Sequence, residues 1–206
     1  MQIHLSDIIP APLADRDLSA SDVWGKKLKL DFSKKYHISA PSGTGKTSLL
    51  GLLYGIRKDF TGELVYEGFK TWDDLRRNKI AVVFQDLLLL DDLTVGENIS
   101  LKNNLHDFFS SDEIVEMMKS LGIIDLKDRT VEKLSRGERQ RVAIIRALCM
   151  PFNFLLLDEP FSHLDEVNTK KSIALIQSMV QRNKAGLLVT NLFADDYFQY
   201  DQTFHL

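Results

Sequence analysis

The residues Ala40–Ser48 restrict the fold of this chain more than any other stretch. Alternating residues precede them at 36–39, and an apolar helical pattern follows, so the glycines fall at a strand-to-helix turn. Gly43 and Gly45 free the backbone to point successive N–H groups at one anion, and the positive end of the helix dipole faces the same spot. The stretch therefore predicts a phosphate-chain site formed by Ser42, Gly43, Thr44, Gly45, Lys46, Thr47 and Ser48.

Two side chains of this stretch carry the chemistry that we expect. Lys46 places a full positive charge beside the β- and γ-phosphates of a nucleotide, and the Thr47 hydroxyl can ligate Mg²⁺. The usual pattern begins with glycine, and here that position is Ala40. The alternative is a glycine-rich turn that binds nothing, which the strand-to-helix context disfavours.

The bulk properties are those of an ordinary globular protein. The chain has 206 residues, 44% hydrophobic and 27% charged, with a net charge of −3 that gives no indication of a nucleic-acid partner. Cys149 is the single cysteine, and the five histidines show no metal-ligand spacing. We find no apolar run long enough to cross a membrane and no signal-peptide pattern at the start. We expect one domain, residues 1–206, in the cytoplasm.

The pattern of apolar runs predicts an α/β fold. Continuous apolar runs at 80–84, 154–157 and 186–190 are typical of strands buried on both faces, and helical patterns separate them, which favours a mostly parallel core sheet. The runs at 28–32 and 62–67 alternate instead, as half-buried strands of an N-terminal antiparallel region would. A helical subdomain, at about residues 87–150, is inserted between two core strands.

Three motifs coincide with the carboxyl ends of the predicted strands, where open parallel sheets bind their ligands. They are the phosphate loop, Gln85, and the pair Asp158 and Glu159. An apolar strand that ends in acidic residues supplies the carboxylate that Mg²⁺ needs opposite a phosphate loop. A plain polar strand end would be the alternative if the acidic pair stood alone.

Taken together, these motifs resemble the nucleotide-binding domain of an ABC ATPase, over nearly the whole chain. The resemblance rests on five stretches in the expected order, namely 40–47, Gln85, 134–140, 155–160 and 162–165. The Leu-Ser-Arg-Gly-Glu sequence that begins at Leu134 is its most specific element. The sequences at 75–77, 83–85 and 94–98 resemble those of ATPase subunits that serve lipoprotein-releasing, macrolide-type or cell-division membrane proteins.

The resemblance implies a phosphate-loop NTPase that hydrolyses ATP with Mg²⁺. Lys46 would stabilise phosphate charge, while Thr47 and Asp158 would hold the metal. Glu159 would position and deprotonate the attacking water. Gln85 would reach the metal and the water and report γ-phosphate occupancy to a partner.

The resemblance also implies two partners. Ser135 and Gly137 begin a helix that would close on ATP held by a second copy, so that a homodimer encloses two ATP molecules. Ser162 and Asp165 would line the dimer interface. An integral membrane permease, encoded separately, would hold the dimer at the inner face of the cell membrane. A regulatory ATP-binding switch with little hydrolysis is the alternative, and the sequence determines neither the cargo nor its direction.

Asn191 is a further departure from the family pattern, and Trp24 and the run 87–90 each fit two alternative roles. Asn191 stands where the family usually has a histidine that contacts the γ-phosphate, so we expect slow or partner-dependent hydrolysis. Trp24 is a candidate for stacking on adenine, and a tryptophan of the core is the equal alternative. The apolar run 87–90 fits either the core of the helical insertion or a groove for a membrane partner's helix.

Overall fold

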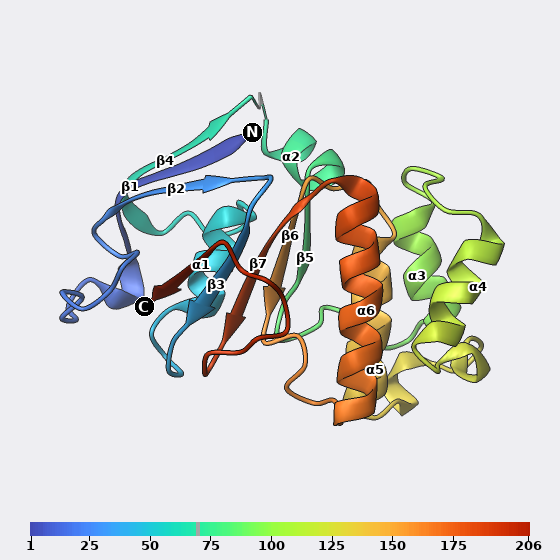
Figure 1. Cartoon of the computed structure of the whole chain (residues 1–206). Helices are drawn as coiled ribbons and strands as arrows, with labels where there is room; N and C mark the ends of the chain where they lie inside the picture. Colours follow the sequence, from blue (N-terminus) through green and yellow to red (C-terminus); the bar gives the residue numbers. More distant parts are fainter. Residues whose placement is uncertain (69–70) are drawn as a thin grey trace.

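The computed structural model describes residues 1–68 and 71–206 and contains two β-sheets (Figure 1). The first is antiparallel, has the strand order β2-β1-β4, and gathers the N-terminal part of the chain. Its alternating burial confirms the prediction of half-buried strands in this region. The strands are β1 (Gln2–Pro10), β2 (Lys27–Asp31) and β4 (Phe60–Glu67).

The second sheet has the order β5-β6-β7-β3-β8, and its pairings are parallel. Strand β6, which pairs with β5 on one side and β7 on the other, is buried along its whole length, as its continuous apolar run predicted. The mostly parallel α/β core is therefore confirmed. Its strands are β3 (Lys35–Ser39), β5 (Ile80–Val83), β6 (Phe154–Asp158), β7 (Gly186–Asn191) and β8 (Gln202–His205).

Helices cover both faces of the core sheet, and three of them, α3, α4 and α5, lie between β5 and β6 in the chain. Figure 1 shows α5 and α6 standing beside the sheet, with α3 and α4 on their outer side. The helices are α1 (Lys46–Leu53), α2 (Trp72–Asn78), α3 (Val95–Asn103), α4 (Ser111–Ser120), α5 (Arg136–Leu148) and α6 (Glu166–Asn183), with short 3₁₀ turns η1 (Ala11–Leu13), η2 (Ile124–Leu126) and η3 (Val131–Lys133).

Helix starts follow the capping chemistry of the sequence. Thr94 and Glu97 form a capping box at the start of α3, and Ser135 and Glu138 form another at the start of α5. Helix α6 begins at Glu166, because the Asp165 carboxylate accepts the N–H of Asn168 and caps the helix.

The core sheet separates two apolar clusters because successive side chains of a strand point to opposite faces. On β6, Leu155 and Leu157 pack with α5 and α6, whereas Phe154 and Leu156 pack with α1 and the N-terminal sheet. Among the described residues, no helix is long and apolar enough to cross a membrane.

This topology places the motifs. The strands β3, β5, β6 and β7 run in the same direction, so their carboxyl ends meet at one edge of the sheet. The phosphate loop follows β3, Gln85 follows β5, Asp158 ends β6 and Asn191 ends β7. Segments far apart in the sequence thereby converge on one side of the molecule.

Candidate functional site

The phosphate loop has the backbone that its glycines permit. Gly43 and Gly45 lie at φ values of 82° and 103°, and Gly45 is the N-cap of α1. A Cβ on Gly45 would lie 2.8 Å from Leu13 Cδ1 and 3.0 Å from Trp24 Cζ2. The loop therefore rests directly on the N-terminal segment, and a larger residue at position 45 would displace it.

Trp24 supports this loop from within the core. Its side chain is 1% exposed, and its indole N–H donates to the carbonyl of Thr44 at 2.9 Å. The ring packs in the apolar cluster beneath α1 and offers no accessible face to an adenine base in this structure. Of the two alternatives that the sequence left open for Trp24, the structure has the core tryptophan.

Lys46 folds back over the loop that precedes it. Its ammonium group donates to the carbonyls of Ala40 at 2.8 Å and Pro41 at 3.0 Å, and it lies 3.2 Å from Glu159 Oε1. Both side chains are largely buried, at 6% and 10% exposure. The predicted phosphate-binding cation and the predicted base therefore form an ion pair across the site.

Asp158 is a fully buried carboxylate held by two threonines. Thr47 donates its hydroxyl to Oδ2 at 2.6 Å, and Thr190 donates to Oδ1 at 2.7 Å. Burial raises the pKa of Asp158 above its usual range, although both hydroxyl groups act to lower it. The Thr47 hydroxyl and the Asp158 carboxylate are adjacent oxygen ligands of the type that Mg²⁺ prefers.

Glu159 follows with an unusual backbone. Its φ is 46°, in the left-handed region that residues other than glycine rarely adopt. Its N–H donates to the Thr190 carbonyl at 2.9 Å. Such conformations persist only where their surroundings hold them, and they concentrate at functional sites. The turn at Glu159 directs its side chain toward Lys46 instead of along the strand.

A cavity of about 270 Å³ joins these residues. It brings Lys46, Thr47, Gln85 and Glu159 together, as the strand ends predicted. Its remaining lining comes from the loop residues Ser42, Gly43, Gly45 and Ser48 and from Pro12, Leu13, Arg16 and Arg57.

Asn191 lies on the other side of Glu159. The two residues line a second cavity of about 210 Å³ together with Ser162 and Asp195. The Asn191 amide donates to Asp195 Oδ2, and the same carboxylate lies 3.1 Å from His37 Nε2 and accepts the Tyr200 hydroxyl at 2.7 Å. Burial opposes ionisation of Asp195, but these hydrogen bonds outweigh it and lower its pKa.

Ser135 and Gly137 lie apart from this cavity at the start of α5. The Ser135 hydroxyl accepts the N–H of Glu138, and Gly137 packs so closely that a Cβ there would lie 2.8 Å from the His163 carbonyl oxygen. Neither residue lines the cavity that contains Lys46 in the same chain.

Comparison with known proteins decides the family. A family model described as ABC transporter matches residues 25–162, about two thirds of the chain. The chain belongs to the ABC transporter family. Its matched region contains the phosphate loop, Gln85, the Ser135 helix start and the acidic pair.

Named relatives of this ABC protein are ATP-binding proteins. It is 32% identical over 173 residues to the thiamine import ATP-binding protein ThiQ of Shigella flexneri, covering 82% of this chain and 75% of that protein. It is 35% identical over 167 residues to the tungstate uptake protein TupC of Peptoclostridium acidaminophilum, with 80% and 77% covered. The chain spans only 45% of the iron import protein FbpC of Mannheimia succiniciproducens, at 30% identity.

Solved structures share the fold. The dimeric structure of MJ0796, a bacterial ABC transporter cassette, superposes with a TM-score of 0.75 at 26% identity, over 91% of this chain and 87% of that one. An ATP-bound exporter of the Atm1 family superposes with a TM-score of 0.76 at 24% identity, over 92% of this chain and 34% of that one. The second likeness supports the fold alone.

Several residues of the site in this ABC protein were not predicted from the sequence. Arg16 donates to the Gly43 carbonyl at 2.8 Å, and Arg57 donates to the Ser48 hydroxyl at 2.7 Å. Neither arginine belongs to a motif, so no local pattern points to it. Thr190 could have been noticed, because a polar residue that ends a buried strand requires a hydrogen-bond partner.

We predict that Thr190→Val destabilises the protein by about 1–3 kcal/mol, because it removes a hydrogen bond from a buried carboxylate without changing the size of the side chain. Urea unfolding measures the loss. Thr190→Ser keeps the hydroxyl and serves as the control, which we expect to lie much closer to the wild type. Equal stability of Thr190→Val and wild type would contradict the assigned role of this hydrogen bond.

Proposed function

We propose that this chain is the ATP-hydrolysing subunit of an ABC transporter. The observation that carries the proposal is the meeting of Lys46, Thr47, Gln85 and Glu159 around one cavity, next to buried Asp158. This set combines a phosphate-binding cation, oxygen ligands for a metal and a carboxylate base. Family membership supplies ATP as the nucleotide.

The mechanism begins with the exchange of partners at Lys46. An arriving triphosphate offers Lys46 anionic oxygens in place of the Ala40 and Pro41 carbonyls and the Glu159 carboxylate. Glu159 is then free to accept a proton from water aligned with the γ-phosphate. Thr47 and Asp158 would hold Mg²⁺, which would supply positive charge to offset that of the phosphates, and Gln85 would orient the water.

A regulatory switch that binds ATP with little hydrolysis is the second candidate. The Asn191 amide is the observation that favours it. A neutral amide cannot place positive charge near the γ-phosphate, and it already donates one hydrogen bond to Asp195. The presence of Glu159 beside Lys46 favours the enzyme, because a switch needs no base.

A second copy of the chain is the first proposed partner. Ser135 and Gly137 lie outside the cavity of their own Lys46, and the N-terminus of α5 suits an anion. In a head-to-tail homodimer each α5 would cover the ATP of the other chain, with Ser162 and Asp165 at the interface. The dimeric structure of MJ0796, 26% identical, supports this arrangement.

A membrane permease is the second proposed partner, and a groove of about 340 Å³ is its docking site. The groove presents exposed leucines, Leu88 at 58%, Leu101 at 50% and Leu105 at 64% exposure. Lys102 and Arg146 also line it, and its described lining contains no acidic residue. An apolar helix that carries a carboxylate fits this groove, and such a permease would hold the chain at the inner face of the cell membrane.

We propose import as the direction of transport. The relatives at 30–35% identity are named for import or uptake of iron, thiamine and tungstate. The short sequences at 75–77, 83–85 and 94–98 instead resemble those of lipoprotein-releasing, macrolide-type and cell-division subunits. The named relatives match about four fifths of this chain, so their similarity is the stronger support and favours import.

Glu159→Gln tests the enzyme. We expect the variant to bind ATP but to release phosphate about 10²–10⁴-fold more slowly than wild type, because the amide cannot accept a proton. The measurements are phosphate release in the native membrane complex and equilibrium ATP binding, with Lys46→Ala as the control that loses binding. A wild-type chain that binds ATP and dimerises without turnover would leave the regulatory switch as the function.

Asn191→His tests the departure from the family pattern. We expect turnover to rise about tenfold or more, because a charge-assisted hydrogen bond at developing phosphate charge contributes roughly 1.5–3 kcal/mol. Asp195 is placed to orient the new imidazole, so adding Asp195→Ala should remove much of the gain. Equal phosphate-release rates for Asn191→His and wild type would show that the amide is adequate.

The groove is tested by adding charge to it. We expect Leu101→Glu and Leu105→Glu to reduce recovery of the chain with washed membranes of its native host at least several-fold, while equilibrium ATP binding stays unchanged. Val65→Glu alters an exposed apolar residue on β4 and is the matched control. Full membrane recovery of both groove variants would contradict this docking site.

A further inference from the structure

Two consecutive leucines after Gln85 have a costly backbone conformation. Leu87 and Leu88 lie at φ values of 60° and 50°, in the left-handed region that favours glycine. Residues in this region persist only where the surrounding structure holds them. Gln85 lies two residues upstream and lines the cavity that contains Lys46 and Glu159.

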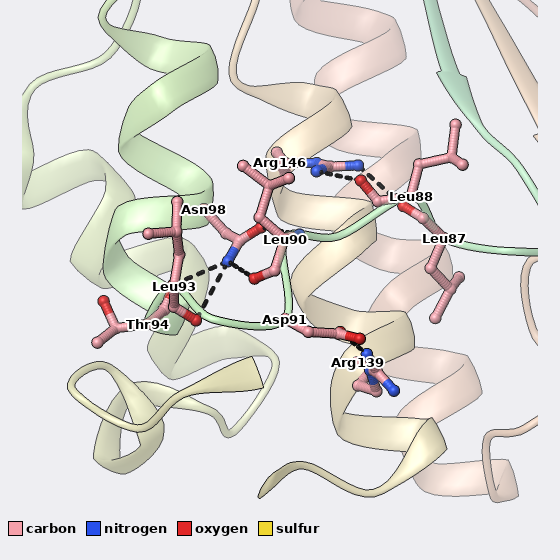
Figure 2. Close-up of polar contacts among 9 residues, drawn as sticks. All are labelled: Leu87, Leu88, Leu90, Asp91, Leu93, Thr94, Asn98, Arg139 and Arg146. Carbon is pink, nitrogen blue, oxygen red and sulfur yellow. Dashed lines mark hydrogen bonds and ion pairs between the residues drawn. The ribbon is translucent and has the colours of Figure 1, made fainter. Parts of the chain in front are cut away.

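The side chain of Arg146 holds both strained residues (Figure 2). Its guanidinium donates from one nitrogen to the Leu88 carbonyl at 2.7 Å and from the other to the Leu87 carbonyl at 2.8 Å. Arg146 belongs to α5, the helix that begins at Ser135. Two parallel hydrogen bonds from a planar guanidinium fix orientation as well as distance.

The segment is also fixed further along, at residues 90–94. The fully buried Asn98 accepts the N–H of Leu90 at 2.9 Å and donates to the carbonyls of Leu90 and Thr94, each at 3.0 Å. Asp91 forms an ion pair with Arg139 of α5 (Figure 2). Strand β5 holds the start of the segment and Asn98 holds its end, so Arg146 acts on the strained part between them.

Arg146 also belongs to the groove proposed for the membrane partner, together with Leu88 and Lys102. Whatever occupies that groove therefore meets the side chain that fixes the backbone after Gln85. Burial lowers the pKa of Arg146, which reflects the loss of water around its guanidinium. Hydrogen bonds to the two carbonyls take the place of that water.

We propose that Arg146 is a positioning residue that keeps Gln85 at the nucleotide cavity by holding Leu87 and Leu88 in their strained turn. This inference rests on the proposed ATPase function. It assigns Arg146 no contact with ATP. Its effect on the reaction passes through the backbone of residues 86–88 to the amide of Gln85.

The first test is Arg146→Met, which keeps much of the apolar stem and removes the donors. We expect kcat for phosphate release to fall about tenfold or more, the Mg²⁺ concentration for half-maximal rate to rise, and ATP affinity without Mg²⁺ to stay the same. Added to Gln85→Ala, the substitution should have little further effect. Arg146→Lys retains the charge without the planar pair of donors, and we expect an intermediate rate.

The second test is a rescue. Leu88→Gly removes the conformational cost at an exposed position, so it should restore part of the lost kcat in the Arg146→Met background. Leu90→Gly is the matched control, because Leu90 is 51% exposed and lies among the described residues without a positive φ. It should restore nothing.

Amide hydrogen exchange over residues 84–90 provides a readout that does not need activity. We expect faster exchange in Arg146→Met and a thermal midpoint close to wild type. A wild-type chain without turnover would overturn the proposed ATPase, while the exchange data would still decide whether Arg146 holds the segment. Unchanged exchange, unchanged kcat, or equal rescue by Leu90→Gly would overturn the inference.

Discussion

The site depends on one buried carboxylate. Asp158 ends β6, an inner strand of the core sheet, and accepts hydrogen bonds from the hydroxyl groups of Thr47 on α1 and Thr190 on β7. An ionised group in this apolar setting needs hydrogen bonds to offset its lost hydration. By accepting them, Asp158 ties the start of the phosphate-loop helix to two neighbouring strands. The positions of Lys46 and Glu159 follow from that arrangement.

Lys46 and Glu159 neutralise each other's charge in this structure. In the structure Lys46 is paired with Glu159 and with two loop carbonyls, so the cation and the base satisfy each other. Neither group has to be buried alone, which would be costly. In the proposed mechanism nucleotide binding would separate the pair, because phosphate oxygens are stronger partners for Lys46 than a backbone carbonyl. Nucleotide binding and activation of the proposed base Glu159 would then be a single event.

Much of the fold could be predicted from the sequence, because its signals are local. Continuous apolar runs predicted the buried strands β5, β6 and β7, and the family resemblance at Ser135 predicted the start of α5. The meeting of the phosphate loop with Gln85 and Glu159 followed from the parallel direction of the strands. The contact of Arg146 with Leu87 joins positions 59 residues apart, and no local pattern encodes it. The burial of Trp24 likewise depends on the packing beneath Gly45.

The close packing at Gly137 has a mechanical consequence. A Cβ on Gly137 would lie only 2.8 Å from the His163 carbonyl oxygen, so the start of α5 packs directly against the loop that follows Glu159. In a dimer, that helix start would serve the neighbour's nucleotide, whereas Glu159 serves the chain's own. Each subunit would thus couple its own ATP site to the site of its partner. Hydrolysis at the two sites would not be independent.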